Sequence, residues 1–389
     1  MHVNPALARC FAPPVMEARR WLEGVDFPPE RPLLNLSQAA PVAPPPAALQ
    51  AAMVEALSDT ATHLYGPVLG LPELRERLAR QMGTIYGGEI AAQQVAITSG
   101  CNQAFCATIS ALAGPGDAVI LPTPWYFNHA MWLAMQGIEA TPLPCDAELL
   151  PDPEAARALI TARTRAIVLV TPNNPTGMEY PPALIASFRD LARARGIALV
   201  IDETYRDFLS TDGTPHDLFS DPDWDDTLIH LYSFSKAYHL TGHRVGAMAA
   251  HPALLAQIEK FLDTVTICPT GLGQRAAVWG LENLSDWLAQ ERAEILRRRS
   301  ALMQGFGALG GWQLRSCGAY FAFVAHPVAT ASDQLAQRLV REAGLLVLPG
   351  TMFTPASDPS GAAHLRIAYA NADLAGLGVL LERLRSFDL

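Results

Sequence analysis

The sequence predicts an α/β protein with a mostly parallel sheet covered by helices and a second, smaller α+β domain. Three observations support this prediction. Short apolar runs recur between residues 95 and 233, helical patterns lie between several of them, and a long amphipathic segment leads into a distinct C-terminal region. With 389 residues, half of them hydrophobic and 17% charged, the chain is long enough to bury a sizeable core.

Composition argues against several classes of protein. A net charge of −10 would repel a nucleic-acid backbone, and no apolar run approaches the roughly 20 residues that span a bilayer. The six cysteines show no CxxC pairing, and the N-terminus lacks the pattern of a secretory signal. We therefore expect free thiols, a cytoplasmic location, and neither nucleic acid nor membrane as a partner. The histidines show no metal-ligand spacing, so no metal site is expected.

The order of the elements follows from prolines, glycines and apolar runs. The proline-dense stretch over residues 38–50 predicts an extended connector, because proline continues neither a helix nor a central strand. The apolar runs that follow have lengths that suit strands buried on both faces. They cover residues 95–98, 118–122, 166–170, 198–202 and 227–233. Between them the clearest helix is predicted over residues 181–196, with prolines at its start and Gly196 as its stop.

The C-terminal region has elements of its own. Residues 284–306 read as one long amphipathic helix, and strand patterns follow over residues 318–325 and 364–370. We therefore expect a large domain over residues 46–285 and a small domain formed by residues 1–45 together with residues 286–389.

Three segments place polar side chains where apolar strands end. In "ITSGCNQAF", Ser99 and Gly100 precede a helix whose first N–H groups can hold an anion, although the segment taken alone is more typical of an ordinary strand–helix turn with Ser99 as N-cap. Asn174 in "NNPTG" is predicted at the carboxyl end of the sheet. Its side chain either contacts a ligand there or forms part of an ordinary Asn-Pro turn. Asp202 ends the next strand and needs a partner, either a ligand or a structural cation.

The segment "SFSKAYHLTGHRVG", residues 233–246, places Lys236 after an apolar strand. A lysine in a desolvated or cationic site loses its proton more easily, and its neutral amine condenses with an aldehyde. An anion-holding turn, a carboxylate and such a lysine are together what pyridoxal 5′-phosphate requires, and Ser233 and Arg244 could take the phosphate oxygens.

These motifs resemble the class I aminotransferase family of fold-type I pyridoxal-phosphate enzymes. The resemblance extends over nearly the whole chain, and "SFSKAYHLTGHRVG" is its most specific part, followed by "NNPTG", "DETY" and "YGPVLGLPELRERLA". It implies a seven-stranded, mostly parallel sheet and a homodimer with shared active sites. It also implies a reaction that moves an amino group between an L-amino acid and a 2-oxo acid.

The resemblance further implies the roles of individual residues. Lys236 would form the Schiff base with the cofactor and move the substrate proton, while Asp202 would pair with the ring nitrogen and Tyr205 and Asn174 with the ring oxygen. Tyr126 would stack on the ring. The phosphate would be held by Ser99, Gly100, Cys101, Ser233 and Arg244, together with Tyr65 from the neighbouring subunit. Arg366 would bind the substrate carboxylate beside Asn174 and Ala39.

Four positions depart from the family pattern. Cys101 occupies a position where the family often has a small residue and where the contact is through the backbone. Ala39 stands where the family usually has glycine, which puts a backbone contact to the substrate in question. His239 and His243 replace apolar or hydroxyl residues, and we expect them to pack rather than to contact substrate.

Alternative functions remain on the same scaffold. The nearest alternative is a carbon–sulfur β-lyase, because the fold and the cofactor do not fix which bond of the substrate breaks. A less favoured alternative is a regulatory module that binds the cofactor without catalysis. For the aminotransferase we expect a neutral or aromatic substrate, because Phe11, Trp125 and Tyr126 are predicted near the site. A dicarboxylic substrate would require a second arginine at its side chain, and the resemblance implies that members preferring such substrates have one. Residues 263–277 offer only Arg275, which lies in a predicted helix where it would serve packing or a surface pair.

Overall fold

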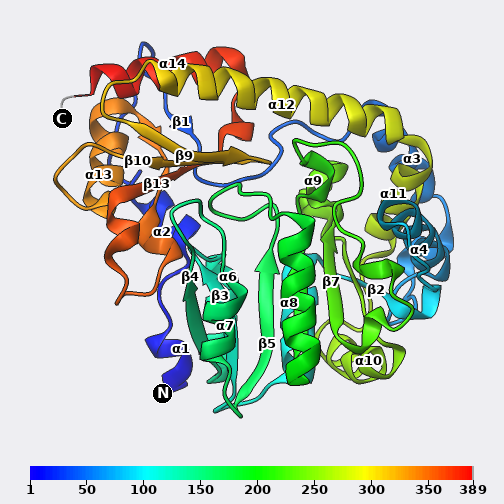
Figure 1. Ribbon diagram of the computed structural model, residues 1–389. Helices are drawn as coiled ribbons and strands as arrows, with labels where there is room; N and C mark the ends of the chain where they lie inside the picture. The colour runs from blue at the N-terminus through cyan, green and yellow to red at the C-terminus, as the bar shows by residue number, and fades with distance from the viewer. Residues whose placement is uncertain (388–389) are drawn as a thin grey trace.

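A seven-stranded sheet forms the centre of the computed structural model, which describes residues 1–387 (Figure 1). Its strand order is β2-β8-β7-β6-β5-β3-β4. The strands are β2 (Val95–Thr98), β3 (Ala118–Thr123), β4 (Glu139–Pro144), β5 (Thr164–Val170), β6 (Ala198–Asp202), β7 (Leu228–Ser233) and β8 (Gly246–Ala249). Strand β8 is antiparallel to both of its neighbours, β2 and β7, and all the other strand pairs of this sheet are parallel, so the predicted mostly parallel arrangement is confirmed.

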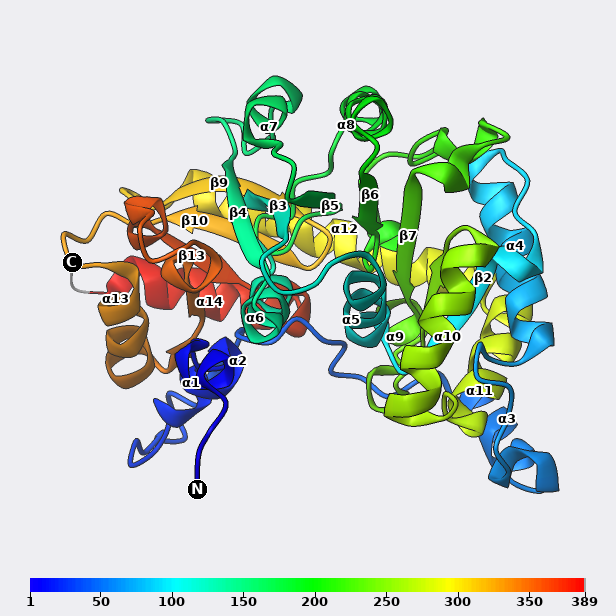
Figure 2. The ribbon, with the colours of Figure 1, turned by 90° about the horizontal axis from the view of Figure 1, so that it is seen from below.

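Helices cover both faces of this sheet, as expected for strands that are apolar throughout. In Figure 2, α7 and α8 project from one face, and α5, α6 and α10 lie on the other. The helices around the sheet are α3 (Ala47–Ala56), α4 (Pro72–Tyr86), α5 (Cys101–Leu112), α6 (Phe127–Gln136), α7 (Pro153–Leu159), α8 (Pro182–Arg195), α9 (Phe234–Ala237), α10 (Pro252–Thr266) and α11 (Gly271–Asn283). Helix α8 starts on Pro182 and ends before Gly196, whose φ of 63° suits glycine, as the sequence predicted.

A smaller antiparallel sheet lies beside the first, in the order β12-β13-β10-β9. Its strands are β9 (Gln313–Gly318), β10 (Phe321–Ala325), β12 (Leu348–Pro349) and β13 (His364–Ile367). A separate pair joins β1 (Leu34–Asn35) to β11 (Leu345–Leu346) in parallel, which ties the N-terminal part of the chain to the C-terminal part. The remaining helices are α1 (Pro5–Arg9), α2 (Pro14–Arg20), α12 (Ser285–Gly307), α13 (Ser332–Arg338) and α14 (Leu374–Ser386).

Helix α12 is the long helix predicted over residues 284–306, and in Figure 1 it runs across the top of both sheets. The predicted connector is partly wrong: residues 36–46 form no helix or strand, but α3 already begins at Ala47. Pro46 precedes that helix, where a proline breaks no hydrogen bond of the helix. The domain boundaries at residues 45 and 285 stay a prediction.

Among residues 1–387, no helix combines the length and the hydrophobicity that crossing a bilayer requires.

Candidate active site

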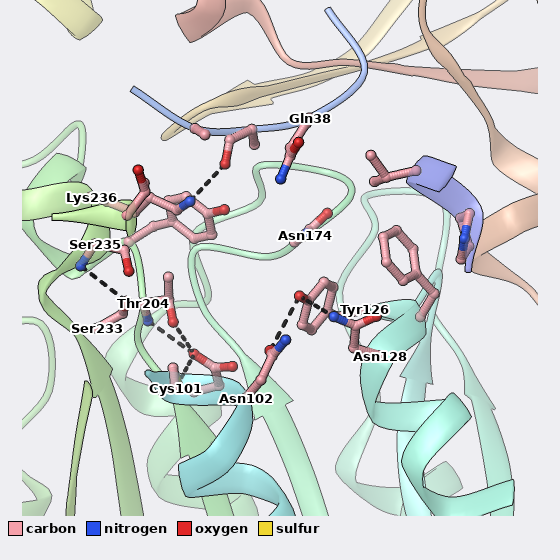
Figure 3. Close-up of a pocket in the computed structure, with 18 of the residues that line it drawn as sticks. Gln38, Cys101, Asn102, Tyr126, Asn128, Asn174, Thr204, Ser233, Ser235 and Lys236 are labelled. Atoms are coloured by element: carbon pink, nitrogen blue, oxygen red, sulfur yellow. Dashed lines mark hydrogen bonds between the residues drawn. The ribbon is translucent and has the colours of Figure 1, made fainter. Parts of the chain in front are cut away.

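A cavity of about 540 Å³ lies at the carboxyl edge of the large sheet. Its walls come from the ends of β5, β6 and β7, the start of α5, residues 38–40, helix α2 and strand β13 (Figure 3). Ten predicted site residues line it. They are Ala39, Cys101, Tyr126, Asn174, Asp202, Tyr205, Ser233, Lys236, Arg244 and Arg366.

Lys236 projects from the short helix α9 into this cavity (Figure 3). Its Nζ donates to the carbonyl oxygen of Ala39 at 2.7 Å. Burial, together with the positive charges of Arg244 and Arg366, lowers the pKa of the Lys236 amine to about 8. Near neutral pH a substantial fraction of this amine can therefore exist in its neutral, nucleophilic form.

Asp202 is 4% exposed, and hydrogen bonds hold its carboxylate in place. Oδ1 accepts the backbone N–H of Thr204 at 3.0 Å and the Thr204 hydroxyl at 2.7 Å, and the Cys101 thiol lies 3.6 Å away. Oδ2 lies 3.3 Å from Nε2 of the buried His129. Burial alone would raise the pKa of Asp202, but the contacts with His129 and Thr204 outweigh it and lower the pKa below its ordinary value. Asp202 is thus held as an anion.

Arg366 reaches the same cavity from β13, where it pairs in register with Phe323 of β10. It is 2% exposed, and its guanidinium donates to Asn174 Oδ1 at 3.1 Å and to the carbonyl of Ser37. Its Nε has no partner among the described residues. Burial lowers the pKa of Arg366 to about 10. Arg366 therefore presents a desolvated cation that can take a planar carboxylate.

Aromatic rings contribute to the walls of the cavity. The Tyr126 hydroxyl accepts from Asn128 at 2.8 Å and donates to Asn102 at 3.3 Å (Figure 3). Burial raises the pKa of Tyr126 to about 12 and raises the pKa of Tyr205 well above its ordinary value. Both phenols therefore remain protonated hydrogen-bond donors at neutral pH.

The start of α5 forms the cationic end of the site together with Arg244. A Cβ atom at Gly100 would collide with the Arg244 guanidinium, and the φ of Gly100 is 89°, so glycine lets the two segments meet. The first backbone N–H groups of an α-helix have no hydrogen-bond partner within the helix. The start of α5 is therefore a favourable place for an anion.

Three predicted site residues are not among the residues that line the cavity. The backbone N–H of Ser99 donates to Gln103 Oε1 at 2.6 Å. Gly100 packs against the Arg244 guanidinium. Tyr65 is 79% exposed on the surface.

The expectation that Phe11 and Trp125 contribute to the substrate pocket is wrong. Phe11 is exposed, whereas Trp125 is buried and bonded through its backbone N–H to Phe353. Neither lines the cavity, because the turn before α6 points Tyr126 and Phe127 into it instead. Helix α2 supplies the remaining apolar wall, with Pro13, Pro14, Val15 and Met16.

His239 and His243 also lie outside the cavity lining, as expected. His239 contacts Glu291 at 3.3 Å and the Trp287 ring, both on α12, so it joins the loop after Lys236 to that helix. Arg275 forms a surface ion pair with Asp59 at 2.7 Å, which confirms its predicted role.

Sequence reasoning missed several residues that shape the site. The sequence could have identified Thr204, because it lies inside the "DETY" motif, two residues after Asp202. Asn128 and His129 lie two and three residues after Tyr126, but the direction of their side chains depends on where α6 begins. Arg19 and Gln38 also line the cavity, and no local motif marks them.

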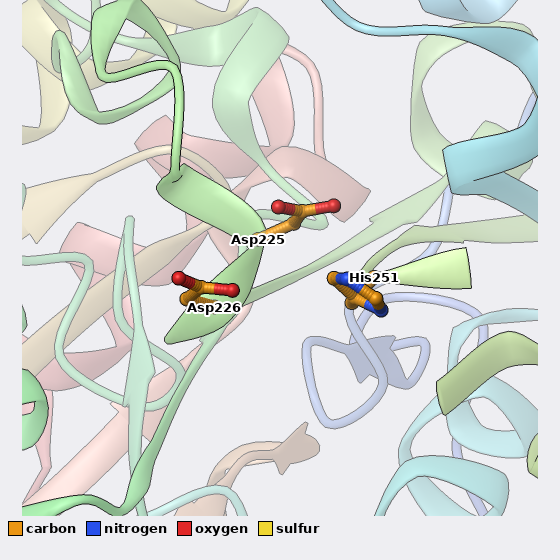
Figure 4. A group of neighbouring side chains, drawn as sticks. All are labelled: Asp225, Asp226 and His251. Carbon is orange, nitrogen blue, oxygen red and sulfur yellow. The ribbon is translucent and has the colours of Figure 1, made fainter. Parts of the chain in front are cut away.

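One group of possible metal ligands occurs among the described residues, formed by Asp225, Asp226 and His251 (Figure 4). Asp225 accepts from Gln94 at 2.8 Å, and His251 Nδ1 accepts the backbone N–H of Ala253 at 3.1 Å. Asp225 and Asp226 precede β7 and so lie at the opposite end of that strand from Ser233. We assign this group no role.

The residues of the cavity fit pyridoxal 5′-phosphate. Among the described lining residues Asp202 is the one carboxylate, whereas Lys236, Arg244 and Arg366 all carry or can carry a positive charge. Such a cavity favours a ligand with a dianionic group and a cationic ring nitrogen. Arg366, whose terminal nitrogens bond only to neutral oxygen atoms and whose Nε has no partner among the described residues, is suited to a further carboxylate.

Comparison with known proteins identifies relatives over almost the whole chain. The family model for aminotransferase class I and II matches residues 31–384. The chain is 30% identical to the aspartate/prephenate aminotransferase of Thermus thermophilus, covering 95% of this chain and 92% of the relative. It is 31% identical to the arginine–pyruvate transaminase of Pseudomonas aeruginosa, covering 86% and 85%. The structure of aspartate aminotransferase from Thermus thermophilus with maleate superposes with a TM-score of 0.89 and 27% identity, covering 99% of each chain.

Proposed function

Because the chain belongs to the class I and II aminotransferase family, we propose that the cavity at the carboxyl edge of its large sheet is the active site. The enzyme is an aminotransferase that uses pyridoxal 5′-phosphate and moves an amino group between an L-amino acid and a 2-oxo acid. The observation that carries the assignment of the site is the meeting of Lys236, Asp202 and Arg366 in one cavity from three distant parts of the chain.

The cofactor, when bound, supplies an aldehyde that condenses with amines and a ring that accepts electrons from the substrate Cα. Asp202 would hold a proton on the ring nitrogen, since its carboxylate is buried and kept anionic by Thr204 and His129. Tyr205 and Asn174 would donate to the ring oxygen. Ser233, Arg244 and the start of α5 would hold the phosphate.

Lys236 would act on the substrate as a general base and acid. Its pKa of about 8 lies much closer to neutral pH than the pKa of an ordinary lysine, so the amine can both take a proton from Cα and return it. The carbonyl of Ala39 orients the amine at 2.7 Å. Arg366 would fix the substrate carboxylate and thereby present the Cα–H bond to Lys236.

The substrate amino acid would carry a neutral, and in particular a bulky or aromatic, side chain. The wall formed by Pro13, Pro14, Val15, Met16 and Phe127 is apolar, which favours such side chains through desolvation. Arg275, the cation considered from sequence for a second carboxylate, is engaged by Asp59 on the surface.

The working unit would be a homodimer in the cytoplasm. Tyr65 is exposed and lies outside its own subunit's cavity, which suits a role in the partner's phosphate site. The six cysteines are all free, which suits a reducing compartment.

Incubation of the purified protein with pyridoxal phosphate, an aromatic amino acid and a 2-oxo acid tests this function. We expect a new amino acid to form in step with the consumed one, and Lys236→Ala to abolish its formation. Release of ammonia and pyruvate from a sulfur amino acid without a new amino acid would instead assign a β-lyase.

A further inference from the structure

His239 is held by contacts from two other parts of the chain. It lies on the segment that follows Lys236, and its side chain is 8% exposed. Nε2 of its ring lies 3.3 Å from a carboxylate oxygen of Glu291, and the ring packs edge-on against Trp287, one turn earlier on α12. Nδ1 lies 3.3 Å from the carbonyl oxygen of Pro44, in the connector formed by residues 36–46. The ring therefore joins the segment of Lys236 to the connector and to α12.

The chemistry of these two oxygen partners determines the charge of the ring. A carbonyl and a carboxylate only accept hydrogen bonds, so His239 makes both bonds only when each ring nitrogen carries a proton. A ring with one proton would turn a lone pair toward one of the two oxygens, and its burial leaves little room for water to replace that partner. The bond that remains is the one to Glu291, because a hydrogen bond to a charged acceptor is about twice as strong. Loss of one ring proton therefore releases Pro44.

The ionisable groups on the elements packed against the ring leave these partners in place. Glu291 forms no other ion pair within residues 1–387, and its neighbour Arg292 pairs with Asp212 at 2.7 Å. The charge of Glu291 also acts on Tyr320, but burial and this charge both raise the pKa of the phenol, which therefore stays neutral. The connector contains no titratable side chain. Glu291 is thus the charged partner of the ring.

The other ionisable groups of the ring's own segment are engaged elsewhere. Lys236 and Arg244 line the cavity. Burial raises the pKa of Tyr238, so its phenol stays neutral. The side chain of His243 makes no hydrogen bond or ion pair within the part of the chain that the structure describes. His239 is therefore the ionisable group of this segment that contacts the connector and α12 together.

Two bonds join the segment of Lys236 to the connector. Lys236 Nζ donates to the carbonyl of Ala39 at 2.7 Å, and His239 bonds to the carbonyl of Pro44. Lys236 gives up its bond to Ala39 whenever its amine reacts, whereas the bond of His239 involves no reacting group. The φ of His239 is 54°, a left-handed conformation that a non-glycine residue keeps only where its surroundings fix it. His239 can therefore hold the connector while Lys236 acts.

We propose that His239 is a positioning residue of the reaction, and that its doubly protonated ring holds the connector beside Lys236. This inference rests on the proposed function of the cavity. As the pH rises and the ring loses one proton, the connector is released at Pro44. Ala39 is then less firmly held, and the amine of Lys236 is less well aligned for the transfer of the substrate proton.

NMR of the imidazole groups tests the charge of the ring in the cofactor-free protein. It gives the pH at which the ring of His239 loses its second proton, and the signal is assigned by its absence from His239→Asn. Glu291→Gln should move this midpoint to lower pH, because it removes the negative charge beside the ring. A midpoint that is the same in the wild type and in Glu291→Gln would overturn the proposal.

Hydrogen exchange of residues 37–43 in the cofactor-free protein tests the hold on the connector. Below the midpoint, His239→Asn should speed this exchange about fivefold relative to the wild type, the effect of one lost hydrogen bond. Above the midpoint the two proteins should exchange alike. Asparagine tolerates the left-handed conformation, so the substitution removes the ring without straining the backbone. His243→Asn, on the same segment, is the matched control and should exchange like the wild type at every pH.

Turnover provides a further readout. Below the midpoint, His239→Asn should lower kcat about fivefold and leave KM within about twofold, because Arg366 still binds the substrate carboxylate. An unchanged kcat, equal changes in kcat and KM, or an effect on exchange that is absent or independent of pH would each overturn the role of His239. A protein whose connector exchanges as predicted but that forms no amino acid would refute the proposed function and leave the contact between His239 and the connector intact.

Discussion

At the scale of single residues, the amine of Lys236 is the group most altered by its surroundings. Its pKa is lowered to about 8 by burial and by two arginines, so we expect its reactivity toward an amine reagent in the cofactor-free protein to rise with pH and level off above about pH 8. Arg366→Gln should move this midpoint to higher pH, because it removes a positive charge. Peptide mass spectrometry can follow the labelling, with the exposed Lys260, the second lysine of the sequence, as internal comparison. The same midpoint in the wild type and in the variant would contradict the electrostatic explanation.

Asp202 provides a second prediction at this scale. Asp202→Asn removes the buried charge that would hold a proton on the cofactor ring, so the single-turnover rate should fall roughly a hundredfold while substrate affinity changes little. Thr204→Val deletes one hydrogen bond to Oδ1 and should cause a smaller loss of the same kind. Comparable losses in rate and in affinity for Asp202→Asn would mean that this carboxylate is structural.

The sequence predicts these two residues because each belongs to a recognisable motif at the end of an apolar strand. It could not predict His129 or Arg19. His129 contacts Asp202 because α6 packs against α5, where the His129 ring stacks on Phe105, and Arg19 meets Gln38 because helix α2 lies at the same cavity as residues 38–40. Such contacts depend on tertiary packing and leave no spacing pattern in the chain.

At the scale of elements, the junction of β2 and α5 determines the phosphate end of the site. Gly100 has a φ of 89°, and a Cβ atom there would meet the Arg244 guanidinium. Gly100→Ala should therefore weaken the binding of pyridoxal phosphate by about tenfold, since a non-glycine residue in this conformation costs on the order of 1–2 kcal/mol. Gly114→Ala is a matched control, because its Cβ would meet nothing within 4 Å. Fluorescence titration with the cofactor measures both, and equal affinities in the two variants would contradict this account of the junction.

The elements that the sequence predicted are those with long apolar runs, such as β5, β7 and α8. Two strands of the large sheet were not predicted. Strand β4 contains Pro142 and Pro144 and pairs only with β3, since an edge strand tolerates residues without an N–H group. Strand β8 is the four-residue segment "GAMA", whose small side chains carry little apolar signal.

At the scale of the whole molecule, the proposed dimer depends on a surface around Tyr65. Leu64 and Tyr65 are 64% and 79% exposed. Val265 and Ile267 are also exposed. The two segments meet where the backbone N–H of Gly66 donates to the Cys268 sulfur. Leu64→Glu should shift the protein toward a monomer in sedimentation and lower its activity, because each site would lose the partner's Tyr65. Val379→Glu, an exposed apolar position on α14, should change neither. A wild type that is an active monomer would exclude shared sites.

We infer above all that Lys236 in this cavity is the amine that carries the cofactor. Borohydride reduction of the protein loaded with pyridoxal phosphate, followed by peptide mass spectrometry, tests it most directly, because the sequence contains only Lys236 and Lys260. The account predicts a phosphopyridoxyl group on Lys236 alone. A modification on Lys260, or none on Lys236 in a protein that still transaminates, would contradict it.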